Sequence, residues 1–166
     1  MSLSSMRPAT DHRELRDAFG CFPSGVTALC AMVGGVPVGM AASSFTSVSL
    51  APPLVSICVQ TSSETWRKLN GVTRLGVSVL SVGHDAACRQ LASKTGDRFA
   101  GIEWTASESG AVFINGSAVW LECLLDQCIP AGDHDIALLQ IEKLHVEPNV
   151  EPLVFHGSRF RQLVGV

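Results

Sequence analysis

The segment VTALCAMVGGVPV, residues 26–38, decides the fold class of this chain. Its first eight residues are mostly apolar, and Gly34 and Gly35 separate them from a second short β-prone run. Paired glycines between such runs are typical of a tight hairpin, because the turn needs positive φ angles that glycine adopts readily. The segment therefore predicts two antiparallel strands.

Short strands are expected along most of the remaining chain. Further strands are expected at residues 54–60, 74–81, 117–129, 135–146 and 153–156, and short helices at 11–19, 66–70 and 85–93. Loops or irregular segments are expected at residues 40–53, 94–99, 101–116 and 130–134. Several evenly spaced strands with only short helices favour a mainly β fold with an antiparallel sheet, and a barrel fits best.

Length and composition indicate one domain with an unusually apolar surface. A chain of 166 residues fits a short tail at 1–10 and a single domain at 11–166, without an interdomain linker. Charged residues make up 16% of the chain, against about 25% in an average soluble domain. We therefore expect a buried interface between subunits.

Several classes of function are disfavoured. The longest apolar stretch, 25–40, is interrupted by glycine and proline and is too short for a membrane span, and residues 1–10 lack the apolar centre of a signal peptide. The net charge of -3 does not suit nucleic-acid binding. We expect a cytoplasmic protein that binds neither membrane nor nucleic acid.

The six cysteines show no metal-ligand spacing. They are expected to be reduced, and Cys30, Cys58 and Cys123 are expected to be buried as small apolar side chains because they lie within apolar runs. No metal site is expected.

The two common nucleotide-binding motifs, G-x-G-x-x-G and G-x-x-x-x-G-K-[ST], do not occur in the sequence. A nucleotide would therefore have to be held by a different kind of site. Residues 41–49 carry five hydroxyl groups that could meet a ligand, although such a segment also serves to cap its own turns. Ser62, Ser63 and Thr65 precede or begin a short helix, where they could bind a phosphate or simply cap the helix.

Two other groups could contribute charge. Lys94 and Arg98 lie on either side of a glycine turn. They could bind a phosphate or stabilise a developing negative charge, or they could simply belong to a solvated loop. His134 lies between two aspartates, where a carboxylate could orient its ring. No neighbouring nucleophile suggests a catalytic triad.

These segments together resemble the flavin reductase-like family of FMN-binding split barrels, the reductase components of two-component flavin-dependent monooxygenases. The matching stretches are FPSGVT at 22–27, PVGM at 37–40, SSFTSVSLAPPL at 43–54, DRF at 97–99, GSA at 116–118, LEC at 121–123, GDH at 132–134, PLVF at 152–155 and RF at 159–160. They occur in family order and span almost the whole chain.

The resemblance implies an antiparallel split β-barrel of Greek-key type, a homodimer with flavin near its interface, and hydride transfer from NADH or NADPH to FMN or FAD for a partner monooxygenase. Carried over by position, the isoalloxazine ring and ribityl chain would lie along Ala42, Ser43, Ser44, Phe45, Thr46 and Ser47. The phosphate would meet Ser62, Ser63 and Thr65, and the flavin would lie close to Lys94 and Arg98. His134 would hold the nicotinamide nucleotide rather than transfer a proton.

One departure from the family pattern concerns aromatic residues. Family members often close with an Arg-Tyr or Arg-Phe pair and carry other tyrosines, whereas this chain contains no tyrosine. Phe160, which the resemblance places among the flavin-binding residues, can therefore only pack or stack. Two alternatives remain open. One is a flavin- or haem-binding split-barrel protein without reductase turnover. The other is an oxidase resembling pyridoxamine-phosphate oxidases, which would need more basic residues around a substrate phosphate.

Overall fold

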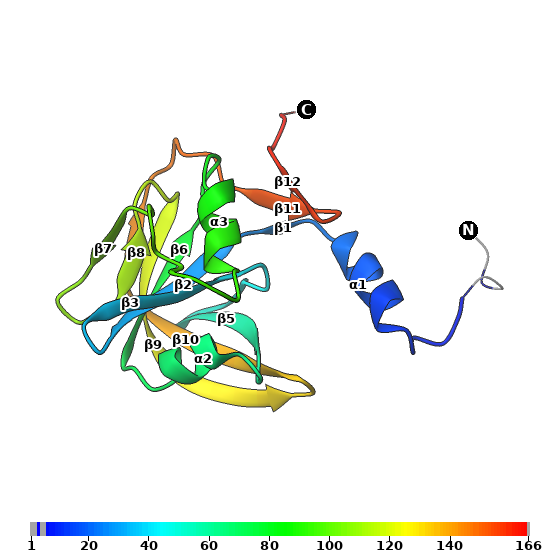
Figure 1. The fold of residues 1–166 in the computed structure, drawn as a ribbon, viewed down its shortest axis with the longest axis horizontal. Helices are drawn as coiled ribbons and strands as arrows, with labels where there is room; N and C mark the ends of the chain where they lie inside the picture. The colour runs from blue at the N-terminus through cyan, green and yellow to red at the C-terminus, as the bar shows by residue number, and fades with distance from the viewer. Residues whose placement is uncertain (1–2, 4–5, 166) are drawn as a thin grey trace.

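The computed structural model describes residue 3 and residues 6–165, and its backbone there forms twelve strands and three short helices (Figure 1). The strands are β1 Ser24–Gly25, β2 Thr27–Val33, β3 Val36–Ala42, β4 Thr46–Leu50, β5 Pro53–Gln60, β6 Arg74–Val79, β7 Trp104–Ala106, β8 Val112–Ile114, β9 Val119–Ala131, β10 His134–Val146, β11 Val154–His156 and β12 Arg159–Arg161. The helices are α1 His12–Gly20, α2 Glu64–Leu69 and α3 Asp85–Leu91. The predicted mainly β fold is confirmed. Residues 1, 2 and 4–5 of the expected tail, and residue 166, lie outside the described part.

A seven-stranded antiparallel sheet forms the body of the protein, in the order β3-β2-β6-β9-β10-β5-β4. The predicted hairpin is its β2–β3 edge, and Gly34 and Gly35 have φ angles of 59° and 81°. Its two edge strands, β3 and β4, are joined by only residues 43–45. The sheet therefore has to curl until its edges approach each other, as in a split barrel.

Strand β2 contributes to two separate apolar cores. Leu29 and Ala31 pack inside the curled sheet with residues of β5, β6 and β10. Ala28 and Cys30, on the opposite face, pack against α3 and β8. Because successive strand residues point to opposite faces, a strand covered on both sides must be apolar without alternation. This explains why 26–33 is an almost continuous apolar run.

The second core depends on a close approach between β6 and β8. A Cβ atom on Gly76 would overlap the backbone carbonyl of Val112, so only glycine fits this position of β6. Two residues further along β6, the Ser78 hydroxyl oxygen accepts a 3.0 Å hydrogen bond from the Ile114 amide of β8. Together these features seat β8 directly against the sheet.

Helix α1 begins where the sequence predicts. The Asp11 carboxylate accepts hydrogen bonds from the amides of Arg13 at 2.7 Å and Glu14 at 3.0 Å, which is an N-cap. No residue of α1 is buried, and the helix projects away from the sheet (Figure 1). Phe19 and the following Phe22 are 70% and 79% exposed.

Three expectations about secondary structure are wrong. Part of the segment expected to be a loop at 40–53 is strand, because β3 continues to Ala42 and β4 pairs with β5. As an edge strand exposed along most of its length, β4 has no need of the apolar alternation that a sequence pattern detects. The short strands β7 and β8 lie within the stretch expected to be irregular, and β12 falls beyond the last expected strand.

The β9–β10 connection is also tighter than expected. The strands continue to Ala131 and resume at His134, so the turn consists of Gly132 and Asp133 rather than residues 130–134. Gly132 has a φ of 67°, which permits this two-residue turn.

The described cysteines are all free thiols. Cys30 and Cys123 are buried as predicted, and burial raises the pKa of each thiol to about 12. Cys58 is exposed, contrary to the prediction, because it lies on the outer face of β5 between the inward-facing Ile57 and Val59. Within the described residues, no helix is long and apolar enough to cross a membrane.

Candidate functional site

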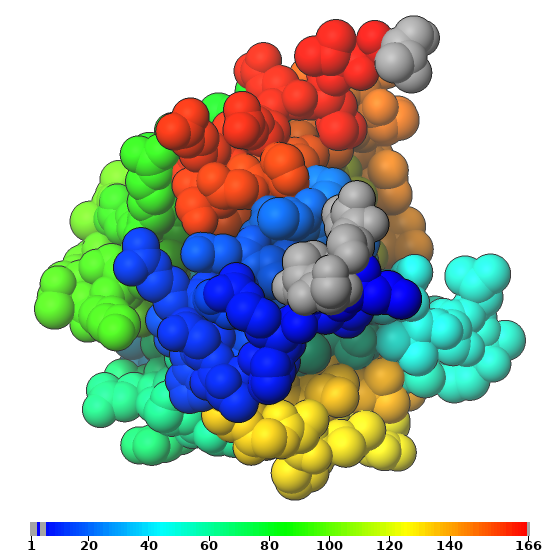
Figure 2. All heavy atoms as spheres, turned by 90° about the vertical axis from the view of Figure 1, so that its right-hand side faces the viewer, coloured from blue at the N-terminus to red at the C-terminus, as the bar shows by residue number. Residues whose placement is uncertain are grey.

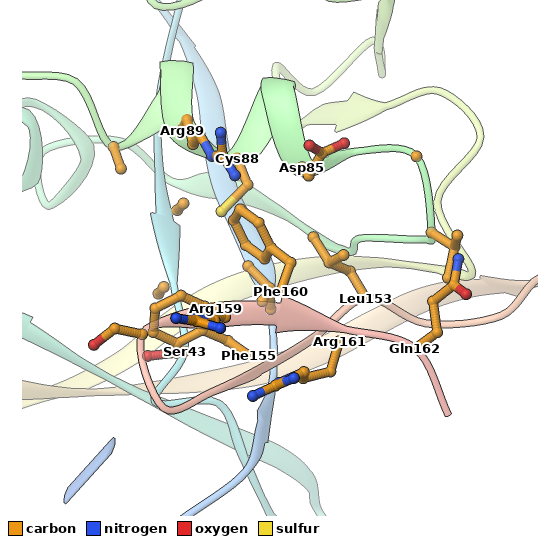
Figure 3. A pocket seen from close by; sticks show the side chains of 17 residues that line it. Ser43, Asp85, Cys88, Arg89, Leu153, Phe155, Arg159, Phe160, Arg161 and Gln162 are labelled. Carbon is orange, nitrogen blue, oxygen red and sulfur yellow. The ribbon is translucent and has the colours of Figure 1, made fainter. Parts of the chain in front are cut away.

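A cavity of about 1030 Å³ lies between α3, the β11–β12 hairpin and the end of β3 (Figure 3). Its volume is at the upper end of the range for small-molecule and cofactor sites. The lining includes three residues predicted for flavin binding, namely Ala42, Ser43 and Phe160. The cavity therefore borders the start of the hydroxyl-rich segment, on the side of the sheet that carries the second core.

Aromatic side chains form one wall of the cavity. Phe160 points from β12 toward Cys88 and Arg89 of α3, and its ring lies 5.5 Å from that of Phe155, centroid to centroid (Figure 3). The Arg89 guanidinium lies 5.2 Å from the centre of the Phe160 ring, a cation–π contact. This packing fixes Phe160, as expected for a residue that can only pack or stack.

The cavity is positively charged although the chain as a whole is acidic. Arg89, Arg159 and Arg161 line it, and Asp85 is its single acidic residue. Arg159 and Arg161 extend from the side of β12 opposite Phe160, as strand alternation requires (Figure 3). These arginines are not among the site residues predicted from the sequence. The alternation R-F-R at 159–161 is the signal that could have found them.

Ser44 links the segment after β3 to β5. Its hydroxyl donates to the Cys58 carbonyl oxygen at 2.9 Å and accepts from the Cys58 amide nitrogen at 2.9 Å. Beyond it, Phe45 packs partly buried against the interior core, whereas Thr46 and Ser47 are exposed in β4. Of the six residues predicted along the flavin ring and ribityl chain, two line the cavity and four lie outside it.

The loop after α3 is fastened to β3 through Arg98. The Arg98 guanidinium donates to the Gly39 carbonyl at 3.1 Å, and Phe99 beside it is buried. Gln90 of α3 holds the same loop by donating to the carbonyls of Asp97 and Ala100. Lys94, at the start of the loop, is exposed and does not line the cavity.

The predicted phosphate segment forms the start of α2. Ser63 is the N-cap, and its hydroxyl accepts a 3.2 Å hydrogen bond from the Trp66 amide. Ser62 is exposed before the helix, and Thr65 is partly exposed in its first turn. The capping role considered from the sequence is therefore present. None of the three residues lines the cavity.

His134 lies at the tight turn between β9 and β10, close to the same helix. Its Nδ1 is 2.7 Å from a carboxylate oxygen of Asp133, and this contact lowers the pKa of Asp133. The Asp133 carbonyl in turn accepts from the amide and hydroxyl of Thr61, which immediately precedes Ser62. The start of α2 and the His134 turn therefore form one hydrogen-bonded unit.

A second bond strengthens this unit. The indole nitrogen of Trp66 donates to the Asp135 carboxylate at 3.0 Å, and Trp66 is 2% exposed. The structure thus brings the predicted residues together in two groups. One group borders the cavity and the other surrounds the turn at His134. Ser44, in the segment between β3 and β4, is bonded to Cys58 of β5, the strand that pairs with β10.

Both groups of residues belong to a chain that is similar to known flavin reductases. The sequence model of the flavin reductase like domain matches residues 19–164. An NADH-dependent FAD reductase from Streptomyces globisporus is 40% identical over 157 residues, which cover 92% of this chain and 86% of that protein. The reductase subunit HsaB of a flavin-dependent monooxygenase from Rhodococcus jostii (strain RHA1) is 34% identical and covers 92% of this chain and 78% of its own.

The structure agrees with the sequence comparison. The Streptomyces globisporus NADH:FAD oxidoreductase SgcE6, solved in complex with NAD and FAD fragments, superposes with a TM-score of 0.90 at 38% identity, covering 96% of this chain and 97% of that one. An antiparallel, barrel-like sheet with a nucleotide-sized, arginine-lined cavity between α3, the β11–β12 hairpin and the end of β3 defines the class of protein. Within that class, this chain belongs to the flavin reductase-like family, which confirms the resemblance seen in the sequence.

Proposed function

We propose that this chain is an NAD(P)H:flavin oxidoreductase, which reduces FMN or FAD with NADH or NADPH and supplies the reduced flavin to a partner monooxygenase. The observation that carries the proposal is the match to the flavin reductase like domain over residues 19–164, together with the cavity between α3, the β11–β12 hairpin and the end of β3. A bound flavin supplies the ring system that accepts the hydride.

The residues around the cavity suit a flavin. An isoalloxazine ring needs a flat, largely apolar surface, and Ala42, Leu153 and Phe155 offer one beside the Ser43 hydroxyl. The negative charge that a reduced flavin gains needs cations nearby, and arginines line this cavity. The chemistry of the lining therefore fits the cofactor.

In this proposal, the second group of residues, at the start of α2 and the turn at His134, binds the phosphate of the flavin and the nicotinamide nucleotide. Ser62, Ser63 and Thr65 would bind the flavin phosphate, aided by Lys94 and Arg98. His134, oriented by Asp133 at 2.7 Å, would hold the nicotinamide nucleotide. Hydride transfer requires the two rings to be aligned rather than a protein acid or base, so these side chains bind and orient.

A homodimer is part of the same proposal. Apolar side chains are exposed on α1 and on both hairpins visible on one face, the β4–β5 hairpin in cyan and the β9–β10 hairpin in yellow and orange (Figure 2). They include Phe19 of α1, Leu50 of β4 and Ile129 of β9, which are 70%, 96% and 43% exposed. A second copy of the chain would cover them. The cytoplasmic location stays a prediction, to be checked by cell fractionation.

The proposal is tested by steady-state oxidation of NADH and of NADPH, each with FMN, with FAD and without added flavin. We expect oxidation that depends on flavin, and the ratio of kcat/KM values identifies the preferred nucleotide and flavin. The matched variant His134→Ala should raise the KM for the nicotinamide nucleotide more than the KM for flavin.

Two results would contradict this account. A protein that binds flavin but oxidises neither nucleotide would be a flavin carrier without turnover. An unchanged nicotinamide KM in His134→Ala would remove the role given to that side chain while leaving the reductase activity itself intact.

A further inference from the structure

Two walls of the cavity come from elements that are joined through the loop after α3. One wall is α3 itself, which carries Cys88 and Arg89 into the cavity, and the other is the end of β3 with Ala42 (Figure 3). Gln90 follows Arg89 in α3 but does not line the cavity. Its side chain is bonded instead to the loop at residues 93–100, which lies between the helix and β3.

Gln90 uses both protons of its side-chain amide on this loop. Its Nε2 atom donates to the carbonyl oxygen of Asp97 at 3.0 Å and to that of Ala100 at 2.6 Å. Because the amide nitrogen carries two protons, neither is left for another acceptor. The Asp97 carboxylate in turn accepts from the Phe99 amide at 2.9 Å. The loop is therefore held against the helix that it follows.

The other side of the loop lies against β3. Arg98 donates to the Gly39 carbonyl at 3.1 Å, and the buried Phe99 packs in the second core with Cys30 of β2. This contact has no spare room, because a Cβ atom on Gly39 would overlap the Cys30 thiol and the Phe99 ring. Packing therefore keeps the loop from moving closer to β3, and the bonds from Gln90 and Arg98 keep it from moving away.

These contacts connect the two walls of the cavity through a fixed loop. Ala42 lies three residues beyond Gly39 in β3, and Arg89 lies one residue before Gln90 in α3, and both line the cavity. Hydride transfer depends on the alignment of two rings, and a displacement of about 1 Å can lower its rate about a hundredfold. A change in the separation of the walls should therefore alter the rate as well as the affinity.

We propose that Gln90 is a positioning residue for flavin reduction, because its two hydrogen bonds to the loop set how far α3 lies from the end of β3. The inference rests on the proposed function for the identity of the ring that occupies the cavity. Gln90 touches neither the flavin nor the nicotinamide in this account. It acts only through the loop and the two walls.

The test removes the two protons of Gln90 and keeps the size of its side chain. Gln90→Glu offers oxygen atoms to the two carbonyls, and Gln90→Met removes the donors without adding charge. In anaerobic single-turnover mixing of the flavin-loaded protein with saturating NADH or NADPH, we expect both variants to reduce flavin at least about tenfold more slowly than the parent. Gln90→Arg, whose guanidinium can donate to two carbonyls, should recover part of the rate.

A second measurement needs neither flavin nor turnover. In the protein without ligand, amide hydrogen exchange of residues 93–100 should be faster in Gln90→Met than in the parent, because the loop has lost two of its bonds. Exchange in α2, which lies outside this loop, should be the same in both proteins.

The rate constant separates positioning from a loss of folded protein. A variant with less folded protein would show a smaller amplitude of flavin reduction with an unchanged rate constant. Thr95→Ala is the matched control, because Thr95 is an exposed residue of the same loop and is bonded to the Ser93 hydroxyl through its backbone. It should keep both the amplitude and the rate constant of the parent.

A double variant tests whether Gln90 and Arg98 act through the same loop. Once either bond is lost, the loop no longer fixes the two walls, so loss of the other should add little. We expect Gln90→Met/Arg98→Ala to be slower than the slower single variant by less than about threefold. Effects that multiply would show that the two residues act independently and would contradict the proposal.

The inference would be overturned if Gln90→Met reduced flavin at the parent rate constant, or if hydrogen exchange of the loop did not change. Neither result bears on whether the parent reduces flavin. A parent that binds flavin without reducing it would contradict the proposed function instead. The visible circular dichroism of the bound flavin, which depends on a fixed ring orientation, would then replace the rate constant, and an unchanged spectrum in Gln90→Met would overturn the inference.

Discussion

The Ser44 hydroxyl is hydrogen-bonded to both backbone groups of Cys58, at 2.9 Å to the carbonyl oxygen and 2.9 Å to the amide nitrogen. This pair of bonds ties the segment after β3 to β5, since Ser44 follows β3 and Cys58 lies within β5. The hydroxyl uses its only proton and one lone pair in this way. Ser44 therefore fixes the segment that carries Ser43 into the cavity.

Replacing this hydroxyl should loosen the connection between the segment after β3 and β5. We expect Ser44→Ala to lower the free energy of unfolding by about 1–2 kcal/mol, because two backbone groups lose their partner. It should also weaken flavin binding, whereas Thr73→Ala, at an exposed position before β6, should do neither. Chemical denaturation and flavin titration of both variants measure these effects. Equal behaviour of the two variants would show that the Ser44 bonds are dispensable.

The indole of Trp66 should matter for the second group of site residues. Trp66→Phe removes the 3.0 Å bond to Asp135, leaves that carboxylate short of a donor and frees α2 from β10. We expect a loss of about 1–3 kcal/mol in unfolding free energy and a higher KM for flavin. Trp120→Phe removes a comparable 2.8 Å bond to the Ile114 carbonyl, away from α2, and is the control. A rise in flavin KM in both variants would argue against a specific role for α2.

Arg98 should act on the site through the backbone of β3. Its bond to the Gly39 carbonyl holds the 94–99 loop against the strand that leads to Ala42. We expect Arg98→Ala to weaken flavin binding roughly tenfold, as for the loss of one hydrogen bond from a charged donor, and to increase proteolysis of the loop. Lys94→Ala should weaken flavin binding less and leave the proteolysis pattern unchanged. The reverse order of the two effects would make Lys94 the important cation.

Stability should fall in mild acid because of His84. Its Nδ1 accepts a 3.2 Å hydrogen bond from the Ser81 amide just before α3, and burial lowers the pKa of His84 below its usual 6.5, partly offset by the Asn115 carbonyl. In the unfolded chain His84 binds a proton near pH 6.5, whereas in the folded protein it does so only at a lower pH. The contribution of His84 to the free energy of unfolding is therefore full above pH 6.5 and is lost as the pH falls below it.

The corresponding measurement compares unfolding midpoints at pH 7.5 and 5.5. The parent protein should lose stability over this interval, and His84→Asn, whose amide oxygen can still accept a hydrogen bond, should lose less. The same pH dependence in both proteins would assign the effect to other groups.

Much of the fold could be predicted from the sequence because most strands are either continuously apolar or bounded by glycine. The β2–β3 hairpin is the clearest example, since Gly34 and Gly35 set its turn and β2 is apolar on both faces. Strand β4 was not predicted because it is an exposed edge strand, and its hydroxyl-bearing residues are equally typical of a loop. Strands β7 and β8 are too short to show a period.

The site was only partly predictable, because its parts are far apart in the sequence. Family resemblance supplied Ala42, Ser43 and Phe160, which the structure places around one cavity. Arg89 and Arg159 could not be paired with them from local sequence, since their shared cavity exists only once α3 packs beside the C-terminal hairpin. Likewise, nothing in the sequence shows that the Ser44 hydroxyl bonds Cys58.

The central claim is that this chain passes hydride from a nicotinamide nucleotide to flavin. Its most direct test is to mix the protein with oxidised flavin and NADH under anaerobic conditions and follow the visible absorbance of the flavin in a stopped-flow instrument, with NADPH in a parallel series. We predict rapid bleaching of the flavin that requires both the protein and a nicotinamide nucleotide. Flavin that stays oxidised with both nucleotides would contradict the account.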